Sequence, residues 1–365
     1  MIWRCDLVPQ YLGLKDEIDA ALQRVLLSGR YILGEEGRRF EEEFAAYLGV
    51  PYAVGVANGT DGLTLALQAV GVKAGDEVIT TPFTAIPTVA AIVDAGALPV
   101  FVDVRPDTFL MDIEQVPNAV TPRTAAVLPV HIFGNPVDIP RLRHLTPSHI
   151  PIVEDAAQAH GSTIHGLKCG SMGDLGVFSF YPTKNLGAYG DGGAIVTHSA
   201  GYSLRLHLRR MYGMVDKDHF EIHGVNSRLD ELQAAVLRCK LRYLDAQNDA
   251  RRVIADRYKR ELPASLFRHQ VVTDGGVCNY HVYVARVASH RDRLMRYLEE
   301  RDIQTNVYYA LPLYRQRAFA DRFEGICLSN VEQLCREVIA LPMYPELEAD
   351  TQNRIIATIS EFRGA

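Results

Sequence analysis

The sequence predicts an α/β protein built on a mostly parallel β-sheet with helices on both faces. Short strand-like runs alternate with helix-like segments, and several of the runs are continuously apolar, as expected for strands buried on both sides. The seven strand-like runs are 53–56, 78–81, 98–102, 125–130, 152–154, 177–180 and 194–197. Helix-like segments at 61–70, 88–95 and 113–119 fall between the earlier strands. We therefore expect a seven-stranded sheet.

The pattern of alternating strand-like and helix-like segments ends at about Asp230. A helical pattern rich in Leu, Ala and Arg runs to about Leu262 and is predicted to be one long helix joining two domains. Beyond it, residues 279–287, 292–301 and 303–309 mix strand-like and helix-like stretches, which indicates a compact α+β unit. We predict a large domain with an N-terminal arm over residues 1–245 and a smaller C-terminal α+β domain over 246–365. The first forty residues are expected to wrap over the active site or a partner subunit.

Composition excludes several function classes. The 365 residues carry a net charge of −6, so the basic footprint of a nucleic-acid-binding protein is missing. The arginines in 206–210 and 251–252 are expected to be solvated. Six scattered cysteines predict free thiols and no metal site. No segment resembles a signal peptide or a membrane span, so we expect a cytoplasmic protein with no membrane partner.

Lys184 is the first candidate functional residue. It follows an apolar run and precedes the glycine-rich stretch 187–193, with aromatics and a proline close by. Small residues leave room for a flat ligand, and an amine held there can form an imine. Taken alone, the lysine would more often be a solvated loop residue.

Two residues of the segment 150–161 could support that lysine. Asp155 ends a strand-like run, and ligands bind at the carboxyl edge of an open parallel sheet. A carboxylate at this edge can keep a pyridine nitrogen protonated, and Gln158 could donate to a phenolic oxygen of the same ring. The alternatives are a helix N-cap for Asp155 and a solvated early helix residue for Gln158.

A second segment could bind phosphate. In 54–67 a strand-like stretch passes through Asn-Gly-Thr into a helix-like one, so the amides of Thr60 and Asp61 would point at an anion near the positive end of a helix. Gly59 permits the tight entry, and the Ser179 hydroxyl could contribute. By itself this motif also fits an ordinary strand-to-helix turn.

Six motifs occur together in one order and carry a resemblance to a known family. They lie at 56–62, 75–82, 99–104, 154–161, 178–193 and 226–235. The chain resembles the DegT/DnrJ/EryC1 family of sugar aminotransferases from about residue 6 to residue 350. This resemblance implies the fold type I architecture of pyridoxal phosphate enzymes, similar to aspartate aminotransferase, and a homodimer with shared active sites.

The resemblance also implies residue roles. Lys184 would bind the pyridoxal 5'-phosphate as an imine and move the proton, and the cofactor would carry the amine as pyridoxamine phosphate. Asp155 would pair with the ring nitrogen and Gln158 with the ring oxygen. Phosphate binding would fall to the remaining cofactor residues, namely Gly59, Thr60, Asp61 and Ser179 of one subunit and Asn226 of the neighbouring one. Residues 226–231 also resemble the capping sequence at the start of a helix, and Asn226 could have this role as well.

One departure from the family pattern concerns the side chain that packs on the cofactor's pyridine ring. Relatives often carry an aromatic residue where this chain has Ala85. We expect Phe83, or alternatively His160, to lie over the ring instead. Core packing is the competing interpretation for Phe83.

The substrate is the least constrained part. Tyr181, in the form Phe-Tyr-Pro-x-Lys, resembles relatives that aminate C-3 of a nucleotide-linked keto-deoxyhexose with an amino group from glutamate or glutamine. Tyr308 and Tyr309, where relatives often read His-Tyr, are expected to close the sugar pocket, and Tyr314 replaces another frequent histidine. Each tyrosine could equally be a half-buried core residue. A C-4 aminotransferase, a sugar dehydratase and a non-catalytic sugar sensor are the alternatives, and the presence of Lys184 and Asp155 counts against the last two.

Overall fold

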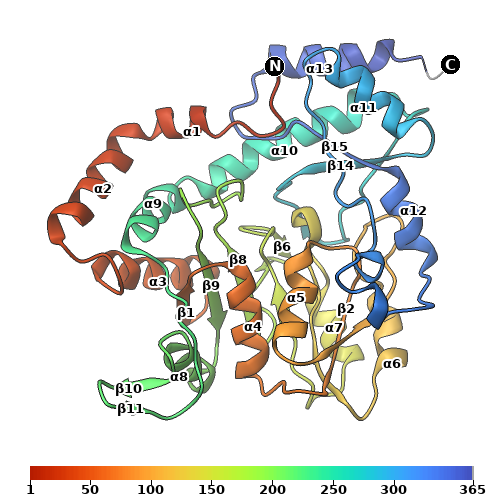
Figure 1. The fold of residues 1–365 in the computed structure, drawn as a ribbon. Coiled ribbons are helices and arrows are strands. Elements are labelled where there is room, and N and C mark those ends of the chain that lie inside the picture. Colours follow the sequence, from red (N-terminus) through yellow and green to blue (C-terminus); the bar gives the residue numbers. More distant parts are fainter. Residues whose placement is uncertain (364–365) are drawn as a thin grey trace.

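The computed structural model describes residues 1–363 and contains the expected central sheet (Figure 1). Hydrogen-bonded strands run in the order β1-β9-β8-β5 and β3-β2-β4, and isolated parallel bridges Val127–Ile152 and Val130–Asp155 connect the two halves. Only β9 runs antiparallel to its neighbours in this sheet. The strands are β1 Tyr52–Val56, β2 Glu77–Thr80, β3 Leu98–Phe101, β4 Thr124–Val127, β5 Val153–Asp155, β8 Leu175–Ser179 and β9 Gly193–Thr197. The mostly parallel, seven-stranded α/β prediction is confirmed.

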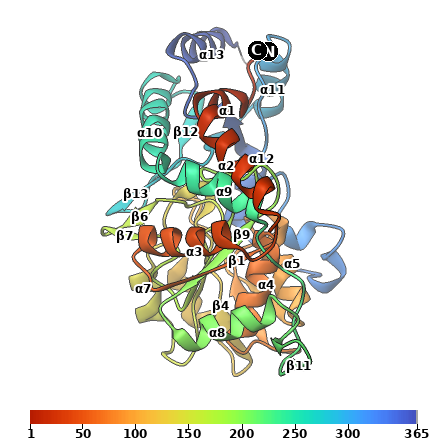
Figure 2. The ribbon, with the colours of Figure 1, turned by 90° about the vertical axis from the view of Figure 1, so that its left-hand side faces the viewer.

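Helices cover both faces of the sheet (Figures 1 and 2). On one face, apolar side chains of α4, α5 and α8 pack against the strands, and on the other the aromatic rings of Phe40 and Phe44 in α3 meet Phe178 and Phe180. The helices are α3 Glu35–Leu48, α4 Gly59–Ala69, α5 Ile86–Asp94, α7 Ile139–Leu145, α8 Ala200–Arg209 and α9 Glu231–Leu241. Burial on both faces explains why the strand sequences are continuously apolar.

The C-terminal part forms a second layer above the sheet. Antiparallel strands β12, β14 and β15 pack with α10, α11 and α13 around a separate apolar cluster. Its elements are α10 Leu244–Glu261, β12 Phe267–His269, β14 Tyr283–Val287, α11 Arg291–Glu299, α12 Ser329–Glu337, β15 Val338–Leu341 and α13 Ala349–Glu361. The predicted boundary at residue 245 falls in the first turn of α10, and the division into two domains remains a prediction.

Two predictions about this region are wrong. The single helix predicted from Asp230 to Leu262 is two helices, because the chain leaves the helical pattern at Arg242 and Tyr243 between α9 and α10. The strand-like stretch 303–309 pairs only through isolated bridges, Ile2–Ile303 and Asn306–Ala340.

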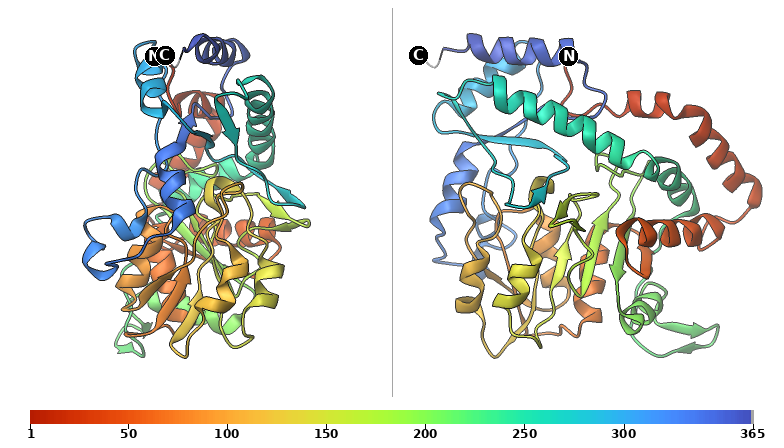
Figure 3. Two further views of the ribbon diagram at one scale, coloured as in Figure 1. Left: turned by 90° about the vertical axis from the view of Figure 1, so that its right-hand side faces the viewer. Right: turned by 180° about the vertical axis from the view of Figure 1, so that it is seen from behind.

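The N-terminal helices α1 and α2 and several short elements complete the fold. They are α1 Val8–Gly13, α2 Lys15–Ser28, η1 Ile113–Gln115, α6 Val116–Ala119, η2 Ile132–Gly134, β6 Thr163–Ile164, β7 Leu167–Lys168, β10 Met214–Asp216, β11 His219–Phe220, β13 Gly276–Val277, η3 Leu313–Arg315 and η4 Ala320–Arg322. The predicted helix at 113–119 is therefore a 3-10 turn followed by one short α-helix. The hairpin β10–β11 projects from the end of the molecule opposite α13 (Figures 1 and 3).

The first residues of the chain belong spatially to the C-terminal part. The Ile2 amide donates to the carbonyl of Asp302 over 2.6 Å, and the Arg4 carbonyl accepts from the amide of Met343 over 3.0 Å. The Ile2 side chain is buried in the apolar cluster of that part. Both ends of the chain therefore lie on the same side of the molecule (Figures 1 and 3).

Two arginines expected in solvent are buried. Arg210 donates to Glu41 and to the carbonyl of Gly55 over 2.5 and 2.9 Å, and Arg251 donates to three backbone carbonyls. A run of arginines predicts a solvated helix face only when no residue far away in the chain accepts hydrogen bonds from their side chains. Across residues 1–363, we find no helix with both the length and the apolar character needed to cross a bilayer.

Candidate active site

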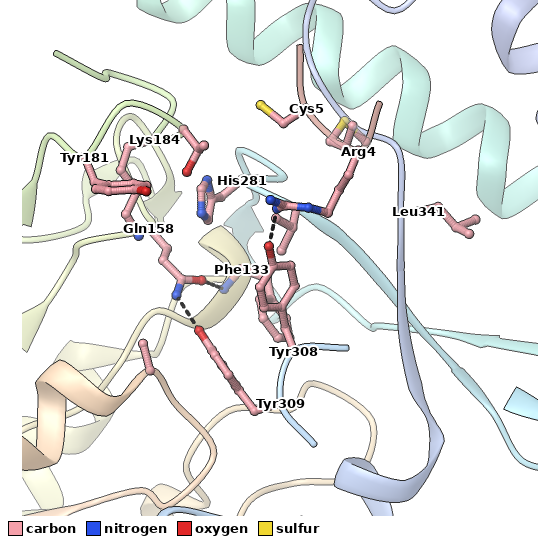
Figure 4. Close-up of a pocket in the computed structure, with 14 residues that line it drawn as sticks. Arg4, Cys5, Phe133, Gln158, Tyr181, Lys184, His281, Tyr308, Tyr309 and Leu341 are labelled. Carbon is pink, nitrogen blue, oxygen red and sulfur yellow. Dashed lines mark hydrogen bonds between the residues drawn. The ribbon is translucent and has the colours of Figure 1, made fainter. Parts of the chain in front are cut away.

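A cavity of about 300 Å³ lies above the carboxyl ends of the central strands, between the sheet and the C-terminal part (Figure 4). Lys184, Gln158 and Tyr181 line it from the sheet side, and Tyr308 and Tyr309 line it from the C-terminal side. The edge location is the one expected for ligands of an open α/β sheet. Five of the predicted site residues therefore meet in one cavity.

Lys184 carries a free amine. Its backbone N–H donates to the carbonyl of Tyr181 over 2.8 Å, which fixes the turn after β8. Among the described residues, no group accepts a hydrogen bond from its Nζ or pairs with its charge. Burial lowers the pKa of Lys184 to about 8, and the carboxylate of Asp155 opposes that shift. Such an amine is partly neutral near neutral pH and available as a nucleophile.

Asp155 ends β5 as a buried side chain. One carboxylate oxygen accepts from the Thr88 hydroxyl over 2.8 Å, and the other accepts from the amide of Ala157 over 3.2 Å. The Thr84 hydroxyl hydrogen-bonds the Thr88 hydroxyl over 2.9 Å and so holds Thr88 in place beside Asp155. Burial raises the pKa of Asp155, while Lys184 opposes the shift. A buried carboxyl of this kind favours a cationic partner.

The neighbouring carboxylate, Glu154, has a structural role. Strand alternation sends it to the opposite face of β5, where it is fully buried. Its two oxygens accept from the amides of Gly170, Met172 and Gly173 over 2.5–2.8 Å, and it lies 2.9 Å from the His131 ring. These hydrogen bonds leave Asp155 as the acid on the ligand side.

Gln158 is held at both ends of its amide. Its oxygen accepts from the amide of Phe133 over 2.7 Å, and its nitrogen donates to the Tyr309 hydroxyl over 3.2 Å (Figure 4). Phe133 has a φ of 59°, and its ring stacks on Tyr309 with centroids 6.3 Å apart. The amide orientation is therefore set by residues from two other segments of the chain.

The structure does not support either predicted ring cover. Phe83 is fully buried, with its ring edge-on to Phe109, Phe133 and Tyr309, and it does not line the cavity. Core packing, the competing interpretation, holds for Phe83. Ala85 lines the cavity instead.

His160 is also outside the cavity wall. Its ring is fully buried and contacts the rings of Phe178 and Phe180. Burial lowers the pKa of His160 to about 3, so the ring is neutral. It acts as part of the aromatic core beneath the sheet.

The predicted phosphate residues converge at the start of α4. A Cβ added to Gly59 would lie 2.8 Å from the Ser179 Cβ, and one added to Gly193 would lie 2.6 Å from the Asn58 carbonyl oxygen. Only glycine fits both positions, so the helix start packs directly on β8 and β9. The backbone at Gly59 and Thr60 is thereby brought beside the Ser179 hydroxyl.

Asp61 is engaged within the chain. Its amide donates to the Asn58 side chain over 2.8 Å, as in a helix N-cap, and its carboxylate accepts from the Ser227 hydroxyl over 2.6 Å. That amide would have to exchange its acceptor in order to bind an anion, so its predicted role stays a prediction. Asn226, next to Ser227, has an exposed side chain and does not line this chain's cavity.

Tyr314 differs from the other singled-out tyrosines. It is buried, its hydroxyl donates to Glu332 over 2.9 Å, and it accepts from the amide of Leu328 over 3.1 Å. It is a core residue outside the cavity.

Arg4, Phe133 and His281 are among the residues of the wall that sequence reasoning missed. His281 Nδ1 lies 3.2 Å from the side-chain oxygen of Asn185, the residue after Lys184. Burial, and then the nearby Lys184 charge, hold the pKa of His281 well below its usual range. The His281 side chain lies between Lys184 and Arg4 (Figure 4). None of the three has a local motif, because each arrives from a segment far away in the chain.

Metal chemistry has no candidate here. Within the described part of the chain, no group of three or more His, Cys, Asp or Glu side chains is arranged to hold a metal ion. All six cysteines are free thiols.

A free, partly neutral amine above a parallel sheet, with an acid at the neighbouring strand end, is the arrangement expected of a lysine-dependent enzyme site. The sequence comparison agrees: the DegT/DnrJ/EryC1/StrS aminotransferase family matches residues 13–360. The chain belongs to this family of aminotransferases. The predicted family and enzyme class are confirmed.

Similar proteins cover nearly the whole chain. A dTDP-3-amino-3,4,6-trideoxy-alpha-D-glucose transaminase from Micromonospora megalomicea subsp. nigra is 44% identical over 361 residues, 96% of each chain. A pleiotropic regulatory protein from Geobacillus stearothermophilus is 42% identical over 363 residues, 98% of this chain and 97% of that one.

Solved structures support the fold assignment. The crystal structure of S. venezuelae DesV in complex with a ketimine intermediate has a TM-score of 0.95 and 42% identity, covering 99% of this chain and 98% of that one. The structure of NtdA from Bacillus subtilis with bound cofactor PMP has a TM-score of 0.89 and 29% identity, covering 95% and 81%. The aminotransferase fold expected from the sequence is thus present throughout the chain.

Proposed function

We propose that this aminotransferase uses pyridoxal 5'-phosphate to move an amino group from glutamate or glutamine to C-3 of a nucleotide-activated keto-deoxy sugar, a dTDP-3-keto-6-deoxyhexose. The observation that carries the proposal is the Lys184 amine, which is unpaired and has a lowered pKa beside the buried Asp155. The retained lysine and acid favour catalysis over a purely regulatory role.

The residues present fit the cofactor. An amine without a hydrogen-bond acceptor suits an aldehyde, and a buried carboxyl whose pKa is raised suits a cationic ring nitrogen. The glycine-lined start of α4, beside the Ser179 hydroxyl, suits a phosphate. When bound, the cofactor supplies an aldehyde that exchanges amines and a ring that stabilises negative charge on the adjacent carbon.

Lys184 has two tasks in this proposal. Its neutral amine would hold the cofactor through the aldehyde group, and it would accept and return the proton at the substrate carbon that exchanges its amine. The lowered pKa supports both tasks, because a lysine with its ordinary pKa would be almost fully protonated at neutral pH.

The surrounding residues hold the cofactor in position. Asp155, oriented by Thr88, would keep the ring nitrogen protonated, and Gln158 would donate to the ring oxygen from the amide nitrogen that now contacts Tyr309. Gly59, Thr60, Asp61 and Ser179 would hold the phosphate. Tyr181, Tyr308 and Tyr309 would contact the sugar, since all three line the cavity.

We further propose a homodimer in which Asn226 reaches the neighbouring subunit's phosphate. The exposed side chains of Tyr31, Ile32, Leu33 and Val225 support it, because the Ile32–Asp230 bridge places both segments near Asn226. Exposed apolar residues gathered around a polar side chain are typical of a surface that a second copy covers.

Mixing inactive variants tests the shared site. Lys184→Ala and Asn226→Asp are each expected to lower activity, and a mixture of the two is expected to recover it. A mixed dimer has one site with an intact lysine from one subunit and an intact asparagine from the other. A mixture no more active than its parts would contradict the shared site.

The substrate proposal rests on relatives and needs product analysis. The 44% identical relative is named for a 3-amino sugar, and cavity tyrosines suit a neutral sugar ring. Incubation of the purified protein with pyridoxal 5'-phosphate, glutamate and a panel of 3-keto and 4-keto nucleotide sugars, followed by mass spectrometry, should show transfer to the 3-keto compounds. Selective transfer to 4-keto sugars would contradict C-3 amination, and no transfer to any of them would contradict the substrate class.

A further inference from the structure

We infer that Arg4 and Tyr308 bind the carboxylate of the amino donor. This inference rests on the proposed amino transfer and assigns a residue that no motif marks. Arg4 is the fourth residue of the chain, yet its guanidinium reaches the wall of the Lys184 cavity (Figure 4).

The charge of the cavity wall selects an anion. Among the described residues that line the cavity, Arg4 and Lys184 are the basic side chains, and none is Asp or Glu. His281, between them, is neutral because its pKa lies well below its usual range. Once Lys184 is engaged in an imine, Arg4 is the permanent positive charge that remains in this wall.

Arg4 has most of its hydrogen-bonding capacity available. Its Nη1 donates to the Tyr308 hydroxyl, and its Cζ lies 5.4 Å from the centroid of the Tyr308 ring. No carboxylate of the described chain forms an ion pair with it, whereas Arg210 and Arg238 bond to glutamates. A guanidinium has five N–H donors in a planar fork, so a carboxylate can bind it through two hydrogen bonds.

The backbone holds Arg4 in place before any ligand arrives. Its amide donates to the side-chain oxygen of Gln304 over 3.0 Å, and its carbonyl accepts from the amide of Met343 over 3.0 Å. Ile2, two residues earlier, pairs with Ile303. A binding group that is already positioned loses little conformational entropy when the ligand binds.

The donor is the substrate that fits this arrangement. Glutamate and glutamine both carry a carboxylate on the carbon that loses its amine, so that group must lie within a few bonds of the Lys184 site. Arg4 and Lys184 line the same cavity, so a small amino acid can place its carboxylate at one and its reacting carbon at the other. A nucleotide sugar carries its phosphates toward the nucleotide end, several bonds away from the carbon that receives the amine.

The half-reaction with L-glutamate tests this inference on the holoenzyme. Loss of the visible cofactor band is followed in a stopped-flow instrument without sugar. We expect Arg4→Gln to raise the glutamate concentration for the half-maximal rate by roughly 30-fold or more, with the maximal rate changed much less. Tyr308→Phe, which removes only the hydroxyl that holds Arg4, should raise it by about tenfold or less.

Arg301→Gln is the matched control. Arg301 stacks over Tyr297, with its Cζ 3.6 Å from the ring centroid, and it lies in the C-terminal part outside the cavity. Its substitution should leave the half-reaction at the parent value. The retained visible band and thermal midpoint of each variant check that the protein is folded.

Binding of dTDP, measured by calorimetry, separates a carboxylate site from a phosphate site. A raised half-saturating glutamate concentration in Arg4→Gln and Tyr308→Phe, with dTDP affinity at the parent value, supports the inference. The inference is overturned if both variants keep the parent's half-saturating glutamate concentration. It is also overturned if the variants bind dTDP more weakly while glutamate saturation is unchanged. If the visible cofactor band of the parent holoenzyme is lost with neither glutamate nor glutamine, the proposed amino transfer itself is contradicted.

Discussion

Two lysines of this protein, Lys184 and Lys240, have similarly lowered pKa values but differ in what surrounds the amine. Burial lowers the pKa of each to about 8. The Lys240 amine donates to the carbonyl of Gly187 over 2.8 Å and lies 4.1 Å from the centroid of the Tyr189 ring. The Lys184 amine has no such acceptor among the described residues and faces the cavity.

The comparison shows that burial alone does not produce a reactive amine. Desolvation makes both lysines easier to deprotonate, but Lys240 uses its proton to hold the glycine-rich loop that follows Lys184. A nucleophile must also have its lone pair free and open space in front of it. Lys240 instead stabilises the loop that follows Lys184, the residue proposed to react.

The largest expected difference comes from removing each amine. Lys184→Ala should abolish the visible band formed with pyridoxal 5'-phosphate and reduce turnover on the order of 10⁴-fold or more, because anchor and proton carrier are lost together. Lys240→Ala should keep the band and most of the turnover. Absorbance spectra and steady-state rates check both, and a band that persists in Lys184→Ala would falsify the anchor assignment.

Asp155→Asn should give the next largest effect. The variant keeps the shape of the side chain but loses the charge that stabilises a protonated ring nitrogen, so turnover should fall by roughly 10²- to 10³-fold. Its visible band should remain, because Lys184 is intact. Parent-like turnover in this variant would contradict the role of Asp155.

The pKa of Lys184 predicts a pH dependence for cofactor uptake by the apoprotein. The neutral amine is the reacting form, and its fraction rises as pH increases through about 8 rather than through the usual 10.5. The uptake rate should therefore rise about tenfold per pH unit below 8 and level off above it. Rapid-mixing measurements between pH 6 and 10 check this, and a rate still rising steeply at pH 10 would contradict the lowered pKa.

Lys240→Met should have the smallest effect. It leaves the Gly187 carbonyl without its donor, which costs about 1–3 kcal/mol, but it also removes a buried charge. We expect a net loss of about 1 kcal/mol in the free energy of unfolding, measured by urea denaturation, with an unchanged visible band. Loss of the band would mean that Lys240 contributes to the chemistry and would remove the contrast with Lys184.

Features carried by local sequence were predicted well. Apolar runs gave all seven strands of the central sheet, and the position of Asp155 after one of them placed it at the ligand edge. The glycine at residue 59 marked a close packing contact, with Ser179 as its neighbour. These signals work because strand burial and tight turns restrict the residue types at each position.

Features that depend on distant segments were not predicted. Thr88, Arg4, Phe133 and His281 reach the site from separate elements, and nothing in their own neighbourhoods distinguishes them from ordinary core or surface residues. The same reason explains the errors at Arg210 and Arg251, whose partners lie far away in the chain. The ring cover expected at Phe83 failed because three other aromatic side chains surround it in the core.

The pairing of Ile2 with Ile303 has a practical consequence for recombinant production. Deleting residues 2–4 would remove the buried Ile2 side chain and the backbone hydrogen bonds that Arg4 makes with Gln304 and Met343. Met1 is exposed whereas Ile2 is buried, so a substitution of Ile2 is expected to weaken the packing of the C-terminal layer and a substitution of Met1 is not.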